Sequence, residues 1–454
     1  MTTVLGIIVA LLILTLLILV HEAAHTLTAR LCGMRVTELF VGLPYGPRFT
    51  WRSPRSGIRF GFSFALLGGY TKISGMSYQR DERLERALAV VNGRGEVEVG
   101  QVARSLDVTD DEAGILLDSL ADIGSIEPCV PERGALRGLP TSFRTVARDA
   151  RGLTVYDRGH DFGLEGSTAA GEPRPGDDAQ AMIDSDLART YDGAGFWKRA
   201  ITLLAGIISN LLLAILLVMA FYMFHGVSTV SPYIAQVTQG SEAEAAGIRA
   251  GDALLSVDGV DVSASYQDVS QALSTAVASG RSFEVTYLRN GESHQTTADP
   301  AESDGSGMFG VTYSYTTVRY GPVDAARAAL SYAGYVATAI VELLVPSHTM
   351  DVLQQSSGII GVVMISGKAA SEGAWQVISL TAALSLSLGW MNLLPFPPLD
   401  GGKLLIEAIQ AVTRRRVSNR VQMALSAVGM ALMIALFVFM IGMDVSRIAD
   451  GTYS

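Results

Sequence analysis

The sequence contains few of the residues that stabilise secreted proteins or keep cytoplasmic proteins soluble. Only two of its 454 residues are cysteine, Cys32 and Cys129, and their wide separation argues against a disulfide framework. Charged residues make up only 17%, whereas hydrophobic residues make up 49%. The formal net charge of −10 argues against general nucleic-acid binding. The composition therefore favours a mixed architecture, with several membrane spans and at least one soluble domain.

The N-terminal segment lacks the features of a cleaved signal peptide. It has no basic residue before Arg30 and no small-residue cleavage pattern ahead of the first histidine. An unbroken apolar run extends from Val4 to Val20. We expect a retained transmembrane helix.

This helix carries the first chemical motif, His21-Glu22-Ala23-Ala24-His25. Histidines four residues apart share one helix face and can chelate one zinc ion, while the glutamate beside them can take a proton from water. Ionisable groups inside a membrane helix are costly, so they favour a functional site. The alternative is a pair of hydrogen-bonded histidines at the end of a buried helix.

A third zinc ligand is expected almost four hundred residues later, in the segment Asn392-Leu-Leu-Pro-Phe-Pro-Pro-Leu-Asp400-Gly-Gly402. Its prolines interrupt a regular helix and free backbone to line a cavity, and Asp400 should lie on the same membrane face as His21. Alone, such a Leu-Asp-Gly sequence is more often a turn. Together with the histidine motif it predicts a zinc ligand, with one position left open for water.

Residues 227–317 resemble a PDZ domain of the bacterial protease type. The resemblance is carried by Gly240-Ser-Glu-Ala-Glu-Ala-Ala-Gly-Ile-Arg-Ala-Gly-Asp252 and by Val257-Asp-Gly259. Domains of this type add a peptide as an extra strand at a sheet edge. The family pattern implies a binding edge near residues 232–235, so Tyr233 and Ile234 are expected to contact peptide.

Residues 80–191 form an acidic soluble insert. Three short helical patterns and a strand pattern are typical of a winged helix, but the third helix carries Asp110, Asp111 and Glu112 and no lysine or arginine. DNA binding is therefore disfavoured, and we expect a regulatory or protein-binding module with a cytoplasmic protein partner. The stretch 163–178, rich in Gly, Pro and Asp, predicts a flexible linker.

The expected fold class is a polytopic α-helical membrane protein with four transmembrane helices, a membrane-associated β-hairpin or sheet region, an α+β PDZ domain and a small soluble α/β cytoplasmic insert. In chain order the segments are a first span at 1–30, the β region at 31–79, the insert at 80–191, a second span at 196–225, the PDZ-like domain at 227–317, an amphipathic helix and connector at 320–372, a third span with its motif at 373–402, a basic cytoplasmic segment at 403–420 and a fourth span at 421–444.

The helix near 320–345 decides the topology. If it crossed the membrane, Asp400 would emerge on the face opposite His21, so we expect it to lie on the outer surface. Most basic loop residues then fall on one side, which the positive-inside rule makes cytoplasmic. The insert is accordingly expected to be cytoplasmic, and the PDZ-like domain and both termini extracytoplasmic.

Taken together, the chain resembles the site-2 protease family of intramembrane zinc metalloproteases, in its bacterial form with a PDZ domain. The matching residues are 21–25, 68–72, 206–210 and 392–402. The resemblance implies one zinc ion per chain, held by His21, His25 and Asp400, with Glu22 as general base. It also implies that Asn392 and Asn210 position substrate and that the Gly69 region presents a strand edge to it.

The implied activity is regulated proteolysis of membrane-spanning proteins in the bacterial cytoplasmic membrane, with anti-sigma factors or signal-peptide remnants as examples of substrates. Two departures concern helix geometry, since Ile207 and Ile359 stand where the family often has proline. One alternative is a non-proteolytic scaffold that captures C-termini and holds a structural zinc ion closed by four protein ligands. A metal transporter is the other, but the four spans show no internal repeat.

Overall fold

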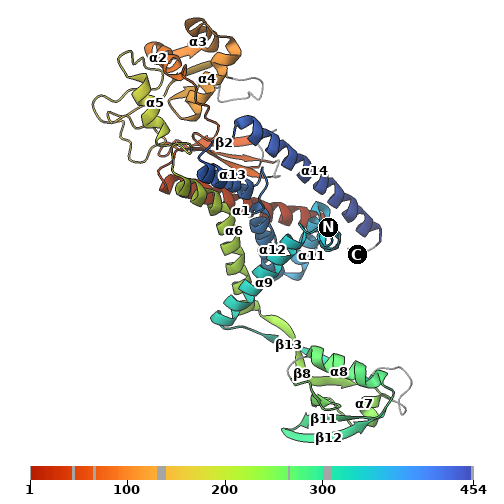
Figure 1. Cartoon of the computed structure of the whole chain (residues 1–454). Helices are drawn as coiled ribbons and strands as arrows, with labels where there is room; N and C mark the ends of the chain where they lie inside the picture. Colours follow the sequence, from red (N-terminus) through yellow and green to blue (C-terminus); the bar gives the residue numbers. More distant parts are fainter. Residues whose placement is uncertain are drawn as a thin grey trace. The chain divides into compact units, whose positions relative to one another are not determined.

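The computed structural model describes residues 2–42, 47–64, 68–129, 140–263, 266–299 and 309–450. The chain forms two compact units. One combines Met1–Val218 with Ala328–Ser454, and the other is Met219–Arg327. Figure 1 shows the elements of each unit.

Four helices in the described part of the chain are long and apolar enough to cross a membrane. They are α1 (Thr2–Leu31), α6 (Phe196–Ala220, continued by a π-helical turn at Phe221–His225), α12 (Ala374–Asn392) and α14 (Asn419–Ala449). Many of their large apolar side chains are exposed in the isolated chain, as expected of side chains that face lipid. The described residues thus hold four candidate membrane helices, at the places in the chain where spans are expected.

A four-stranded sheet follows α1 directly. Its strands are β1 (Val36–Val41), β2 (Arg48–Arg52), β3 (Arg59–Ser63) and β4 (Gly69–Ile73), in the order β2-β3-β1-β4. Strand β4 pairs antiparallel with β1 and packs against α1. Because β4 is the last strand on its side, one edge of it has no strand partner among the described residues.

The insert has its own hydrophobic core, formed mainly by α2 (Leu84–Arg94), α3 (Val99–Leu106) and α4 (Asp110–Asp122). Capping boxes begin both α3 and α4. A three-stranded sheet of β5 (Glu96–Glu98), β7 (Ser142–Thr145) and β6 (Ile126–Pro128) and the helix α5 (Ala179–Leu187) complete it.

The stretch 163–178 differs from the flexible linker that its composition predicts. Thr168 and Arg148 exchange backbone hydrogen bonds of 2.8 and 3.0 Å. Gly171 donates to Thr145, and Arg174 donates to Asn92. These bonds hold the stretch against the insert as a series of turns.

A buried arginine connects the insert to the four-stranded sheet β1–β4. Arg35 precedes β1 and is only 1% exposed. Its guanidinium donates to both carboxylate oxygens of Asp157, at 2.8 and 2.7 Å, and to Asp186 at 3.0 Å. Burial raises the pKa of Asp157, but the hydrogen bonds and charge of Arg35 outweigh this and hold it below its usual value.

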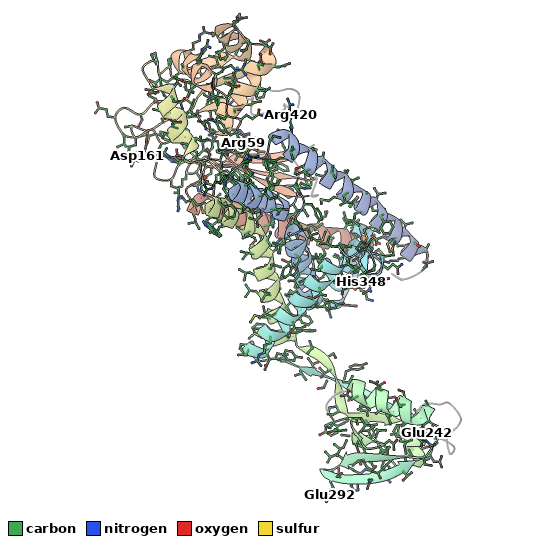
Figure 2. The ribbon with its side chains drawn as sticks, viewed as in Figure 1. Arg59, Asp161, Glu242, Glu292, His348 and Arg420 are labelled. Atoms are coloured by element: carbon green, nitrogen blue, oxygen red, sulfur yellow. The ribbon has the colours of Figure 1, made fainter. Side chains whose placement is uncertain are left out.

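The second unit is a sheet with two helices, α7 (Glu242–Ala245) and α8 (Tyr266–Ala278). Its strands are β8 (Val227–Val237), β9 (Ala253–Val257), β10 (Val260–Asp261), β11 (Phe283–Arg289), β12 (Glu292–Ala298) and β13 (Val311–Val318). The order is β12-β11-β9-β8-β13, with β10 paired to β9. In Figure 2, Glu242 and Glu292 mark the starts of α7 and β12.

Tyr233 and Ile234, expected at a peptide-binding edge, lie on a strand that has a neighbour on each side. Tyr233 pairs with Ala253 of β9, and Ile234 pairs with Tyr313 of β13, so β8 is an internal strand. Ile234 is also buried in the core of this unit. An internal strand has no free edge to which a peptide can add. In the described part of the chain, the sheet ends at β13 on this side.

The helix expected between residues 320 and 345 is α9 (Pro322–Glu342), which is not one of the four helices long and apolar enough to cross a membrane. Its alanines at every fourth position, Ala325, Ala329 and Ala333, are buried on one face. Trp390 of α12 donates its indole N–H to the carbonyl of Ala333 at 3.2 Å. The remaining helices are α10 (Thr349–Gln355), α11 (Ile359–Glu372) and α13 (Asp400–Thr413).

Candidate active site

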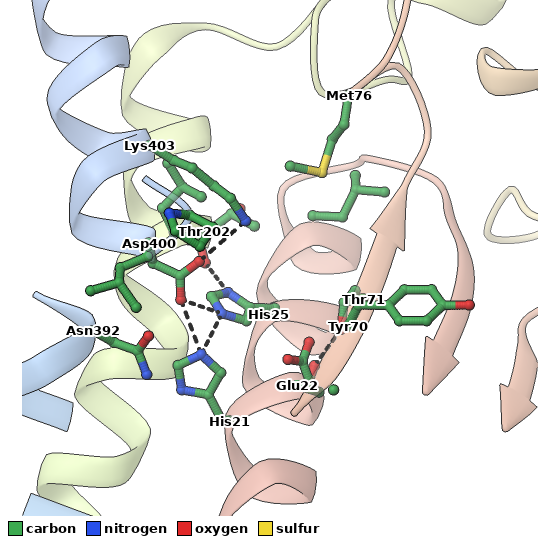
Figure 3. A pocket seen from close by; sticks show the side chains of 15 residues that line it. His21, Glu22, His25, Tyr70, Thr71, Met76, Thr202, Asn392, Asp400 and Lys403 are labelled. Carbon is green, nitrogen blue, oxygen red and sulfur yellow. Dashed lines mark hydrogen bonds and ion pairs between the residues drawn. The ribbon is translucent and has the colours of Figure 1, made fainter. Parts of the chain in front are cut away.

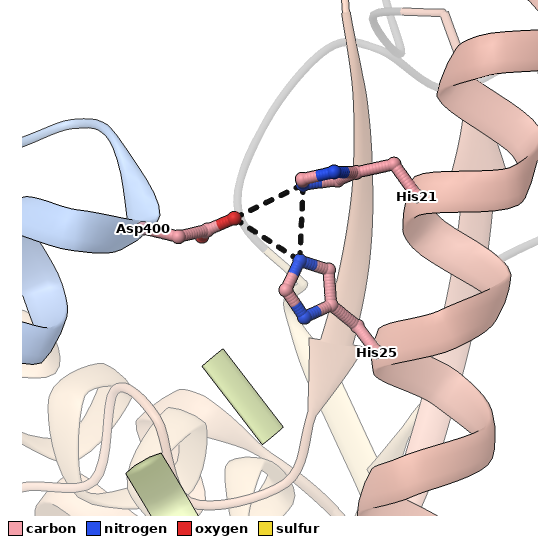
Figure 4. A group of neighbouring side chains, drawn as sticks. All are labelled: His21, His25 and Asp400. Atoms are coloured by element: carbon pink, nitrogen blue, oxygen red, sulfur yellow. Dashed lines mark hydrogen bonds and ion pairs between the residues drawn. The ribbon is translucent and has the colours of Figure 1, made fainter. Parts of the chain in front are cut away.

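Two histidines of α1 and one aspartate of α13 converge on a single point. His21 and His25 lie one helical turn apart, and Asp400 is the first residue of α13, where the proline-rich segment ends. Asp400 Oδ2 lies 3.0 Å from His21 Nε2 and 3.1 Å from His25 Nε2, and the two Nε2 atoms are 3.1 Å apart (Figure 4). All three residues are buried.

This arrangement fits a zinc ion. Ligand atoms around tetrahedral zinc lie about 3.3 Å from one another when each is about 2 Å from the metal, close to the three distances observed. Two imidazoles and one carboxylate are a ligand set that zinc accepts. In the described part of the chain no other three histidine, cysteine or acidic side chains meet in this way. Three protein ligands leave one position open, which disagrees with a closed structural site.

Helix α6 holds both imidazoles from behind. The Nδ1–H of His25 donates to the carbonyl of Thr202 at 2.7 Å, which leaves the lone pair of Nε2 free for a metal. His21 Nδ1 lies 3.3 Å from the amide of the fully buried Asn210, whose Oδ1 has no hydrogen-bond partner among the described residues. A half-turn of that amide places Oδ1 where it accepts the Nδ1–H of His21.

Gly206 makes this close approach of α6 feasible. A Cβ atom at this position would lie 2.4 Å from His25 Nε2 and 2.7 Å from His21 Nε2. Both distances are well below van der Waals contact, so any larger residue would displace an imidazole. The helix therefore needs glycine at the point where it faces the histidine pair.

Strand β4 and Glu22 form the opposite wall of a pocket of about 190 Å³ (Figure 3). Glu22 is buried within it, and the Thr71 hydroxyl donates to the Glu22 carbonyl at 2.9 Å. A Cβ atom on Gly69 would lie 2.5 Å from Ile18 Cγ2 and 3.0 Å from Glu22 Cγ. Glycine thus lets the unpaired edge of β4 begin directly beside Glu22.

The other predicted residues occupy different places. Asn392 ends α12 and lines the pocket, and its side chain forms no hydrogen bond with a described residue, so it is available to a ligand. Asn210 does not line the pocket, because it lies behind His21. Its surroundings favour a role in orienting the imidazole over the expected contact with substrate.

Two neighbours of the site were not expected from the sequence. Lys403 Nζ lies 3.6 Å from Asp400 Oδ1, the oxygen that faces away from the histidines. Its position one helical turn after Asp400 is a sequence signal that could have predicted the contact between the two side chains. Thr202 acts through its backbone carbonyl, which no residue type reveals.

A second ion pair holds α13 against α6. Arg199 Nη1 lies 3.0 Å from Glu407 Oε2, and the Tyr191 ring packs beneath the same guanidinium. Burial raises the pKa of Glu407, while the charge of Arg199 opposes that rise. Burial and the neighbouring Glu407 also raise the pKa of Tyr191. This pair fixes the helix that begins with Asp400.

Comparison with known proteins identifies the family. The profile of peptidase family M50 matches residues 9–436. The chain belongs to this family. Because site-2 proteases are M50 peptidases, the resemblance seen in the sequence is confirmed. The M50 match extends across both compact units.

Similar proteins of this family carry names that agree with the site. "Putative zinc metalloprotease LL2128" of Lactococcus lactis is 26% identical over 450 residues, which cover 95% of this chain and 96% of that protein. "Putative zinc metalloprotease Atu1380" of Agrobacterium fabrum is 26% identical over 455 residues, covering 96% and 94%. "Putative zinc metalloprotease SPs1691" of Streptococcus pyogenes is 26% identical over 451 residues, covering 98% and 99%.

Proposed function

We propose that this M50 peptidase cleaves peptide bonds within or near the transmembrane segments of membrane-anchored proteins, using one zinc ion held by His21, His25 and Asp400. The observation that carries the proposal is the meeting of three ligand atoms from residues up to 379 positions apart, beside a buried glutamate. The site lies among helices apolar enough to span a membrane.

When bound, zinc supplies Lewis-acid polarisation of the scissile carbonyl and makes water a better nucleophile. Glu22 is the general base, because it lines the same pocket and can accept a proton from the attacking water and pass it to the leaving amine. Thr202 and Asn210 hold the two imidazoles in the orientation that a ligand needs.

Strand β4 presents the substrate. A transmembrane helix hides its carbonyls in internal hydrogen bonds, so it must unwind before hydrolysis. The free edge of β4 begins at Gly69 and offers backbone N–H and C=O groups to such an unwound segment. Asn392, at the pocket wall away from β4, is placed to bond the same segment.

The remaining parts serve access to the site. The second unit acts as an extracytoplasmic PDZ domain, in which β13 is the free edge on the side of β8. The insert is a cytoplasmic module of winged-helix type that binds a protein partner and not nucleic acid. Both termini lie outside the cytoplasm, in agreement with basic residues between Arg30 and Arg59 and between Arg414 and Arg416 on one face.

The test is Glu22→Gln in the purified full-length chain, reconstituted in lipid with a membrane-anchored reporter. Loss of the general base should lower cleavage about 10²- to 10⁴-fold, while the zinc content measured by mass spectrometry stays unchanged. Glu82→Gln, on the exposed surface of the insert, is the matched control. Persistent cleavage by the Glu22→Gln variant would overturn the proposal.

A further inference from the structure

A second pocket lies at the end of α1, away from the zinc ligands. Its volume is about 210 Å³, and four of its lining residues are arginines: Arg30, Arg35, Arg158 and Arg189. Asp157 is the one acidic residue in the lining. Nothing in the proposed proteolytic chemistry uses these residues.

The charges around this pocket do not balance. Arg35 and Arg148 pair with Asp157 and Asp186 at 2.5 to 3.0 Å, and this buried group of four is neutral as a whole. Arg189 reaches Asp157 only at 3.5 Å, after both carboxylate oxygens have accepted hydrogen bonds from Arg35.

The positive charge that no acidic residue balances belongs to three arginines at the pocket. The side chains of Arg30 and Arg158 form no ion pair or hydrogen bond with a described residue, and they lie close enough for their like charges to repel. The Nη1 atoms of Arg30 and Arg189 are buried without a hydrogen-bond partner among the described residues. A buried N–H donor without an acceptor is costly, so these two Nη1 atoms and the nearby charge of the exposed Arg158 favour an anion that accepts several hydrogen bonds.

The position of Arg30 indicates where that anion comes from. Arg30 lies in the last turn of α1, between Leu27 and Leu31, whose side chains are 61% and 65% exposed. Large apolar side chains on the outside of a spanning helix face lipid. The mouth of the pocket therefore lies where the acyl region gives way to phosphate headgroups.

We infer that Arg30, Arg158 and Arg189 bind the phosphate of one anionic phospholipid headgroup. Arginine guanidinium groups match phosphate oxygens in geometry and charge, and three of them around one cavity neutralise a phosphate more completely than a single interfacial arginine does. Asp157 shares the lining, but Arg35 already donates to both of its carboxylate oxygens and balances its charge.

The probe is phosphatidylglycerol, mixed with an equal amount of phosphatidylcholine in vesicles that carry the full-length chain. After extraction in mild detergent, native mass spectrometry counts the lipids that remain bound. The wild-type chain should retain one phosphatidylglycerol in preference to phosphatidylcholine. Arg158→Gln, at an exposed residue, should weaken retention about tenfold, and Arg30→Gln with Arg158→Gln should weaken it further, because each change removes charge-assisted hydrogen bonds.

The matched control is Arg86→Gln, which removes the same charge from the exposed face of α2. Circular dichroism and the thermal midpoint of each variant show whether it is folded, and Arg158→Gln alone suffices if the double variant is not. Equal phosphatidylglycerol retention by Arg158→Gln and wild type would overturn the site. If inorganic phosphate binds the lipid-free chain and displaces phosphatidylglycerol completely, the ligand is soluble phosphate, and the lipid assignment is overturned.

Discussion

Replacing Gly206 by alanine adds one methyl group to α6 at the place where that helix touches both imidazoles. The new carbon would lie 2.4 Å from His25 Nε2 and 2.6 Å from His21 Cε1, whereas ordinary contacts begin near 3.4 Å. One of the two rings, or the helix, must therefore move by about 1 Å. Zinc–nitrogen distances tolerate only about 0.2 Å of change.

The expected result is a loss of zinc affinity of about 100-fold or more. Substitutions that merely disturb a partner of a ligand already cost about 10- to 100-fold, and here the ligand itself is displaced. Cleavage should fall in parallel. The helix itself should not suffer, because alanine is a better helix former than glycine by about 1 kcal/mol.

The assay is competition for zinc between the purified chain and a chelator of known affinity, followed by metal analysis. Gly114→Ala is the matched control, since it makes the same change inside a helix where a Cβ atom meets nothing within 4 Å. Unchanged zinc affinity in a folded Gly206→Ala variant would refute the placement of α6 against the histidine pair.

Three further outcomes are expected. Gly69→Ala should lower reporter cleavage at least about tenfold with zinc content unchanged. The added methyl group pushes β4 away from Ile18, so the substrate paired with β4 is no longer aligned with the zinc ligands. Asn210→Ala should weaken zinc binding about 10- to 100-fold in chelator competition, whereas a residue that only contacts substrate would raise KM and leave zinc affinity unchanged. The pKa of Asp157 is lowered in the fold, so its contribution to stability is complete above the unfolded value of about 4 and is lost as the pH falls below it. The hydrogen-exchange protection factors of residues 140–191, which correct for the intrinsic pH dependence of exchange, should therefore fall in acid, and in Asp157→Asn they should be low already at pH 7, with a weaker acid dependence.

The sequence could predict which residues form the site, because their chemistry depends on residue type and spacing. Two histidines at helical spacing and an aspartate after a proline-rich stop are recognisable as ligands from their residue types and spacing alone. Their meeting required only that both lie near the same face of a membrane, which the basic residues indicate. The distances among them, near 3 Å, depend on packing of α1, α6 and α13 that no local pattern encodes.

Other features could not be predicted because they depend on partners distant in the chain. The stretch 163–178 has the composition of a linker, yet Thr145 and Asn92 supply the carbonyl acceptors that order it. The pattern of β8 predicts a strand but not its neighbours, so it does not reveal that Tyr233 pairs with Ala253 of β9. The carbonyl of Thr202 orients His25 whatever its side chain.

The ion pairs of Arg35 with Asp157 and Asp186 determine when, during synthesis of the chain, β1 can reach its final position. Arg35 leaves the ribosome early, but its two carboxylate partners, Asp157 and Asp186, follow more than a hundred residues later. Until then the guanidinium cannot be buried without a large cost, and β1 cannot settle in its final place. Strand β4, which pairs with β1 beside Glu22, is then held only once the insert has been made. Until Asp186 has been made, the chain therefore has no settled β4 edge beside Glu22 for a substrate to join.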